Sequence, residues 1–132
     1  GACTFTLDGT TRRPLLSGLS DQEKRMYNGE MIFPTLKLNL FPDYAQYRAL
    51  SPLGPDRTRI VTEWLFERST MDLSDFYPKD HVQFINLIAR QDWDVCERVQ
   101  QGVASRSYSH GVYVPQETGA LEFKAWYLDR LA

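Results

Sequence analysis

The stretch LKLNLFPDYAQYRALSPLGPDRTRIVTEWLF, residues 36–66, decides the fold class. Its first five residues alternate leucine with lysine or asparagine, which is the two-residue period of a strand with one buried face. Residues 44–50 form a second candidate strand, and a Gly-Pro-Asp turn follows at 54–56. The alternation resumes over 58–66 with β-branched and aromatic side chains. Short connections between consecutive strands predict an antiparallel meander.

A helical pattern follows in DHVQFINLIARQDWDVCERVQQG, residues 80–102. Asp80 is the candidate N-cap and Gly102 the C-terminal stop, so one long helix is expected over 79–102.

The rest of the chain is organised around these two segments. The lead, residues 1–29, is rich in turn-forming residues and is expected to be a loop with a short helical turn at 21–26. Antiparallel strands are expected over 30–68, and a second, short helix over 117–131. Strands followed by helices predict an α+β fold in one domain, or in one piece of a domain.

Composition excludes several classes of function. The chain has 132 residues, 42% of them hydrophobic, and a net charge of -2. Such a charge indicates neither a nucleic acid nor an anionic membrane as partner, and no apolar run reaches the ~20 residues of a membrane span. Cys3 and Cys96 lie far apart, and Cys96 is expected to be a small buried thiol in the helix. These features predict a soluble, cytoplasmic protein.

One carboxylate stands on the apolar face of the long helix. At about 100° per residue, Asp92 falls in the middle of an apolar stripe. The stripe consists of Phe84, Ile85, Ile88, Val95, Cys96 and Val99. A buried carboxylate needs a cation, a metal or several donors. The helical projection alone leaves two interpretations of Asp92 open. It forms a salt bridge or accepts from a backbone amide of a neighbouring loop, or it has a metal-binding or catalytic role.

The two histidines do not complete a metal site with this carboxylate. A facial triad for non-heme iron needs two imidazoles and one carboxylate at one point. His81 precedes Asp92 by eleven residues, which is about 16 Å along a helix. His81 is therefore expected to be a helix-start residue and His110 a solvated loop residue. The spacings also indicate no nucleophile–histidine pair and no phosphate-binding glycine motif.

Three segments resemble a known family. They are NGEMIFPTLKLNLFPDYAQYRALSPLGPDRTRIVTEWLF, QDWDVCERVQQGVASRSY and PQETGALEFKAWYLDRL, and the likeness covers about residues 9–131. Together they resemble the C-terminal part of the catalytic domain of Rieske ring-hydroxylating oxygenase α subunits. The most specific run consists of Asp92, Glu97, Gln100, Gly102 and Ser105. Phe33-Pro34 and the Pro52–Arg59 hairpin also match, whereas Thr35 stands where the family usually has Asn.

The resemblance implies a fold and a metal ligand. The implied fold is the helix-grip arrangement, in which an antiparallel sheet wraps a long C-terminal helix, incomplete in this chain. Asp92 maps onto the carboxylate ligand of the family's mononuclear Fe(II), while Asp94 points to the opposite side of the wheel. The chain contains neither the histidine pair of that iron nor the motifs that hold the Rieske [2Fe-2S] cluster. Both are expected upstream of Gly1, in a longer parent protein.

The resemblance also implies an activity for that parent. It is the dioxygen-dependent hydroxylation, by mono- or dioxygenation, of an aromatic or a quaternary-ammonium substrate. A reductase or ferredoxin would supply electrons, and the parent would be a homotrimer. Phe84, Ile88 and Val95 are candidates for the pocket lining or for plain core packing. The chain alone is expected to be inactive. The alternative is a stand-alone helix-grip module that binds a hydrophobic ligand without catalysis.

Overall fold

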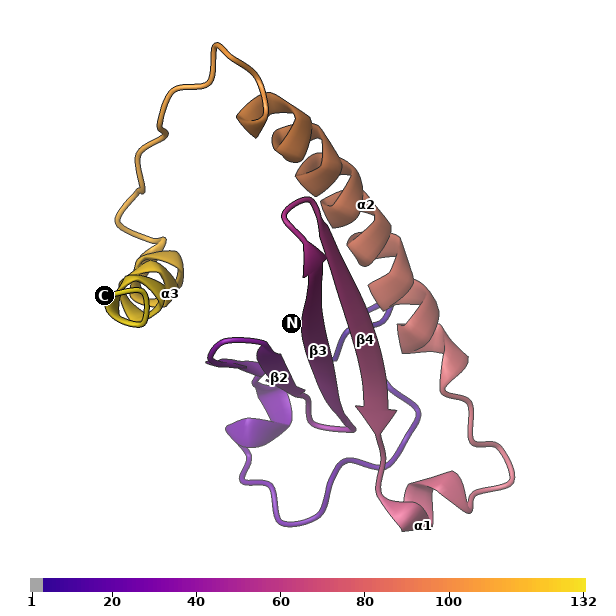
Figure 1. Ribbon diagram of the computed structural model, residues 1–132. Coiled ribbons are helices and arrows are strands. Elements are labelled where there is room, and N and C mark those ends of the chain that lie inside the picture. The colour runs from indigo at the N-terminus through magenta and orange to yellow at the C-terminus, as the bar shows by residue number, and fades with distance from the viewer. Residues whose placement is uncertain (1–3) are drawn as a thin grey trace. The chain divides into compact units, whose positions relative to one another are not determined.

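The computed structural model describes residues 4–132, with a short 3-10 helix, then the strands, and then the α-helices (Figure 1). The elements are a 3-10 helix, η1 (Glu23–Arg25), four strands, β1 (Asn28–Ile32), β2 (Leu36–Leu40), β3 (Ala45–Gly54) and β4 (Arg57–Leu65), and three helices, α1 (Arg68–Met71), α2 (Lys79–Val103) and α3 (Thr118–Asp129). The α+β class is confirmed, while the helix-grip arrangement stays a prediction. The chain divides into two compact units, Gly1–Glu97 and Arg98–Ala132.

The four strands form one antiparallel meander in the order β1-β2-β3-β4. β1 begins inside the segment expected to be a loop, because its sequence NGEMI lacks a clear alternation, and pairing with β2 satisfies its backbone. β3 continues past Leu50, where the predicted strand ends, and a register shift between Pro52 and Gly54 accommodates the proline. The β3–β4 hairpin is therefore the longest part of the sheet (Figure 1).

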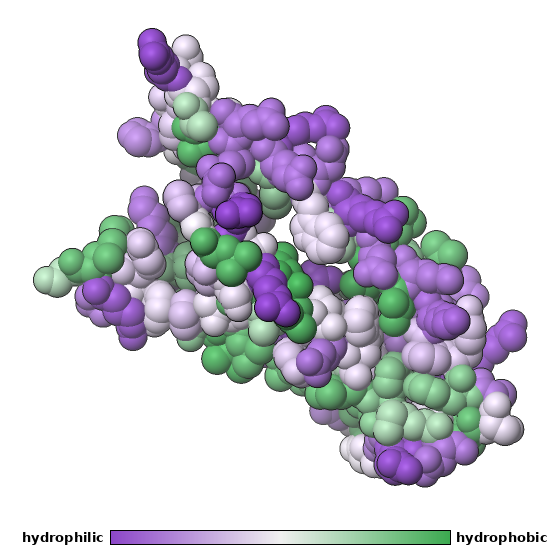
Figure 2. Space-filling model, turned by 45° about the vertical axis from the view of Figure 1, so that its right-hand side comes forward, coloured by the Kyte–Doolittle hydropathy of each residue, from purple (hydrophilic) through white to green (hydrophobic). Residues whose placement is uncertain are grey.

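The buried centre of the first unit is small and partly polar. Its buried apolar side chains include Phe41, Pro42, Tyr44, Ile85 and Ala89. Buried polar side chains accompany them, namely Thr4, Thr6, Asn39, Asp43, Gln46, Thr70 and His81. Figure 2 shows hydrophobic side chains on the visible surface, interspersed with hydrophilic ones. The packing of this unit therefore depends on hydrogen bonds as well as on apolar burial.

The second unit contains the end of α2, a loop and α3, with no buried residue in α3. Within it, the Arg130 guanidinium lies 4.1 Å from the centroid of the Trp126 ring, a cation–π contact. Among the described residues, no helix combines the length and the apolarity needed to cross a bilayer.

Candidate functional site

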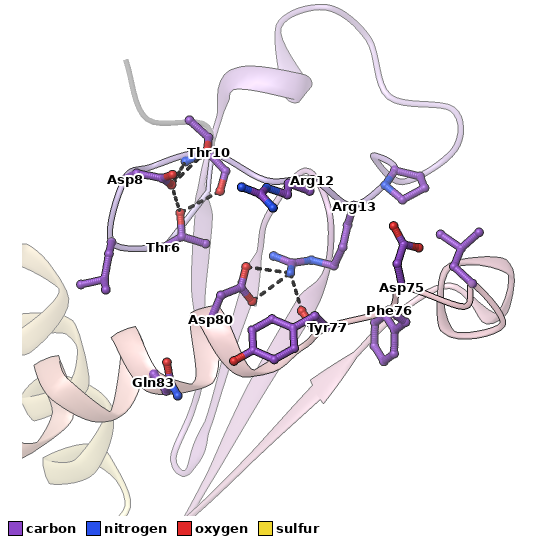
Figure 3. Close-up of a pocket in the computed structure, with 13 residues that line it drawn as sticks. Thr6, Asp8, Thr10, Arg12, Arg13, Asp75, Phe76, Tyr77, Asp80 and Gln83 are labelled. Carbon is purple, nitrogen blue, oxygen red and sulfur yellow. Dashed lines mark hydrogen bonds and ion pairs between the residues drawn. The ribbon is translucent and has the colours of Figure 1, made fainter.

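One arginine joins the N-terminal turn of α2 to the lead segment (Figure 3). The Arg13 guanidinium donates to both carboxylate oxygens of Asp80 at 2.9 Å and to Asp43 Oδ2 at 2.9 and 3.1 Å. It also donates to the Tyr77 carbonyl at 3.0 Å, and the Thr4 hydroxyl donates to Asp43 Oδ1 at 2.7 Å. The side chains of Arg13 and Asp43 are 6% and 0% exposed. Loss of one partner of such a buried ion pair would leave an uncompensated charge, which strongly destabilises a fold.

His81 lies beside this network, in the first turn of α2, and is fully buried. Its ring stacks on Tyr44 at a centroid distance of 4.4 Å and lies 5.3 Å from that of Phe66. Its Nδ1 is 3.0 Å from Asp80 Oδ1, which also accepts the His81 backbone N–H at 2.8 Å. Burial and the charge of Arg13 lower the pKa of His81, against the opposing pull of Asp80. The lowered pKa favours the neutral form of the imidazole, whose ring packs on Tyr44.

The apolar stripe of α2 is covered only near its N-terminal end. His81, Ile85 and Ala89 are buried, whereas Asp92 and all residues after it in the helix are exposed. No described residue makes a hydrogen bond or an ion pair with Asp92, so neither the salt bridge nor the backbone bond is present. The expectation that this carboxylate is desolvated is wrong for this chain, because nothing described packs over it.

The same exposure corrects the interpretation of Cys96. Its thiol is free and exposed on α2, not buried, because it lies beyond the covered turns of the helix. Cys3 lies outside the described residues.

The residues expected to line a substrate pocket differ in their exposure. Phe84 is half-buried and its ring lies 6.2 Å from that of Phe5, Ile88 is half-buried, and Val95 is 58% exposed. Their role as a pocket lining stays a prediction. A pocket of about 730 Å³ lies elsewhere, on the side of α2 where Arg13 binds Asp80 (Figure 3). Its lining consists of Thr6, Leu7, Asp8, Thr10, Arg12, Arg13, Pro14, Leu73, Asp75, Phe76, Tyr77, Asp80 and Gln83.

The described residues do not form a complete metal site. Residues 4–132 contain no group of three histidine, cysteine or carboxylate side chains placed to hold one ion. His81 is enclosed about 16 Å along α2 from Asp92, and His110 belongs to the second unit. Of the ligand set that non-heme iron requires, the structure fits one member, the exposed and unpartnered Asp92.

A row of hydrogen-bonded side chains crosses one face of the sheet. The Tyr27 hydroxyl donates to Asn39 Oδ1 at 2.7 Å, and Asn39 Nδ2 donates to Gln46 Oε1 at 2.9 Å. Asn39 and Gln46 are 4% and 1% exposed. Burial raises the pKa of Tyr27, and the nearby charge of Arg48 opposes the rise. The alternation of residues 36–40 assigns Asn39 to the solvent side, so the sequence gives no sign of this row.

Ring contacts through Phe5 connect the polar row to α2. The Phe5 ring lies 5.2 Å from the Tyr27 ring and 4.8 Å from the Phe41 ring, and it also meets Phe84 of α2. Phe5 therefore bridges the polar row and the helix. Asp92 lies about two turns after Phe84 on the same helix.

The sequence is similar to one protein family and to several monooxygenases. The profile of a family described as "Ring hydroxylating alpha subunit (catalytic domain)" matches residues 1–132. The oxygenase subunit of glycine betaine monooxygenase from Chromohalobacter salexigens is 28% identical over 99% of this chain and 30% of its own length. Chloroplastic choline monooxygenases from Spinacia oleracea and Atriplex hortensis are 28% and 27% identical over 71% of this chain, and over 21% and 22% of their own lengths. The chain thus spans less than a third of these relatives.

Proposed function

Because this chain belongs to the ring-hydroxylating oxygenase α-subunit family, in its catalytic domain, we propose that it supplies Asp92 as the carboxylate ligand of mononuclear iron. The protein that contains the chain is then a Rieske-type oxygenase. Residues beyond these 132 would supply the other iron ligands and would hold the [2Fe-2S] cluster. Iron bound there would supply the activation of dioxygen beside the substrate.

The observation that carries the proposal is the position of Asp92. It lies about 20° around the helix from the buried Ile85, so it continues the packed face of α2. It is nevertheless exposed and has no partner among the described residues. A carboxylate on a packing face, without a protein partner, is free to bind a metal when further chain covers the helix. Ile88 and Val95 would then lie near the ligand and exclude water from it.

The proposed substrate is a small quaternary-ammonium compound. The relatives reported above are named for glycine betaine and for choline, and both are monooxygenases. Monooxygenation of such a compound is therefore proposed in place of the hydroxylation of an aromatic compound. A ferredoxin or reductase would deliver the electrons, and the subunits would form a trimer. The alternative, a ligand-binding module without catalysis, makes no use of an unpartnered Asp92.

The test is the iron content of the full-length protein that contains this chain. Asp92→Ala is expected to lower bound iron per subunit at least tenfold and to abolish oxygen uptake that depends on glycine betaine or choline. Asp94→Ala is the matched control, because it lies on the same exposed part of α2 but about 200° around the helix. Alanine is the best helix former, so neither change should disturb α2.

Two results would contradict the proposal. One is an iron content in the Asp92→Ala protein equal to that of the Asp94→Ala and the unchanged proteins. The other is stoichiometric iron binding with turnover by the 132-residue chain alone, which would place a complete site within these residues.

A further inference from the structure

On the face of the sheet that carries the polar row, the four strands contribute two cations, Lys37 and Arg48, and no acidic residue. The register places Lys37 of β2 directly opposite Arg48 of β3 on this face. The two acidic residues of the strands, Glu30 and Glu63, pair with Leu38 and Tyr47 and therefore lie on the other face. Neither Lys37 nor Arg48 makes an ion pair with a described residue. Like charges directly opposite one another destabilise a sheet unless an anion compensates them.

Three N–H groups on this face are buried without an acceptor among the described residues. They are Gln46 Nε2, Arg48 Nε and Trp64 Nε1. Gln46 and Trp64 are directly paired across β3 and β4, and Arg48 is two residues along β3, so all three side chains are neighbours. A buried N–H that lacks an acceptor is costly, and a native protein normally provides one.

The polar row fixes the direction of the Gln46 amide. Its Oε1 accepts from Asn39, whose own Oδ1 accepts from Tyr27, so the Gln46 Nε2 donor is turned away from the row. Only 1% of Gln46 is exposed, so its side chain cannot turn this donor to solvent. Arg48 is only half-buried, so its side chain has room to move for an incoming group.

We propose that Gln46, Arg48 and Trp64, with Lys37 at the rim, bind the carboxylate group of the substrate. Three N–H donors and two cations are complementary to a carboxylate, which accepts several hydrogen bonds and carries one negative charge. This inference rests on the proposed function and makes it more specific. The substrate is a quaternary-ammonium carboxylate of the glycine betaine type, and the uncharged hydroxyl of choline is a poorer match.

The test uses the full-length protein and measures dissociation constants by calorimetry for glycine betaine and for choline, without turnover. Gln46→Glu keeps an oxygen to accept from Asn39 but replaces the Nε2 donor by a negatively charged oxygen. It is expected to weaken glycine betaine binding at least 100-fold and to leave choline binding within about threefold. Arg48→Met is expected to weaken glycine betaine binding about 10- to 100-fold, the worth of a charge-assisted hydrogen bond.

Arg59→Met is the matched control. Arg59 lies on β4 and pairs with Ser51, which places it on the opposite face of the sheet, where it is exposed. This variant is expected to bind both compounds as the unchanged protein does. Melting temperatures of all variants show that each is folded.

The outcomes separate this inference from the proposed function. It is overturned if the unchanged protein does not prefer glycine betaine, or if Gln46→Glu and Arg48→Met change both constants equally or not at all. Iron content is measured in the same preparations. Loss of iron in Asp92→Ala, with no change of ligand preference in Gln46→Glu, would leave the proposed function standing and remove only the carboxylate site. If Gln46→Glu abolishes the preference for glycine betaine but the unchanged protein binds no iron, the carboxylate site stands and the proposed function is removed.

Discussion

The Arg13 guanidinium and the Asp43 carboxylate meet at 2.9 Å although 30 residues separate them, and water reaches neither side chain appreciably. Arg13 also holds Asp80, so one side chain joins the lead segment, the β2–β3 turn and the start of α2. The position of α2, and of Asp92 on it, therefore depends on this arginine.

Arg13→Met is expected to lower the free energy of unfolding by about 3–5 kcal/mol, because it leaves a buried Asp43 without its cation. Arg12→Met is the control, since Arg12 is exposed and makes no ion pair with a described residue, and its effect should stay within about 0.5 kcal/mol. Denaturant titration of both variants decides the matter. Equal effects would show that the pair contributes little.

The buried His81 predicts a loss of stability in mild acid. Burial and Arg13 lower its pKa below the usual 6.5, so the unfolded chain takes up a proton at a pH where the folded chain does not. The contribution of His81 to the free energy of unfolding is fully present above about pH 6.5. It falls as the pH decreases from there towards the pKa of His81 in the folded chain. The charged groups near the ring are Arg13, Asp43 and Asp80.

His81→Phe should flatten this part of the pH profile, because phenylalanine keeps the stack on Tyr44 and does not titrate. His110→Phe, a change at an exposed loop histidine, should leave the profile as it was. The measurement is the melting temperature between pH 7.5 and pH 5. If the melting temperature of His81→Phe falls with decreasing pH as steeply as that of the unchanged protein, other groups cause the acid sensitivity.

Replacement by alanine should lower the free energy of unfolding of the 132-residue chain by different amounts at the two ends of the apolar stripe of α2. Ile85→Ala is expected to cost about 2–4 kcal/mol, because Ile85 is 5% exposed and its removal leaves a cavity. Val95→Ala should cost less than about 0.5 kcal/mol, since Val95 is 58% exposed. In the full-length protein a larger cost for Val95→Ala would indicate that it is covered there. Chemical denaturation of both proteins gives the comparison.

The polar row on the sheet should contribute measurably to stability. Tyr27→Phe removes the donor to Asn39 Oδ1 and is expected to cost about 0.5–1.5 kcal/mol. Tyr77→Phe, at a ring that is 53% exposed, should be neutral. Thermal melts compare the two, and a neutral Tyr27→Phe would mean that water replaces the lost bond.

Local patterns in the chain predict much of the fold but not its burial. The alternation in residues 36–40 predicts the strand there, and the helical period predicts α2. The same alternation places Asn39 in solvent, whereas the structure buries it against Gln46, because cross-strand partners are set by register and not by the pattern of one strand. The wheel likewise places Cys96 on a packed face, and the structure exposes it.

By itself the sequence determined the α+β class, the family and the single carboxylate on the apolar face of α2, because periodicity and motif spacing are local properties of a chain. The tertiary structure decided that Asp92 is exposed, that His81 is buried far from it, and that Gln46, Arg48 and Trp64 share one face without acceptors. These facts depend on which distant segments pack together. Burial and hydrogen-bond satisfaction are properties of that packing, so no pattern within one segment contains them.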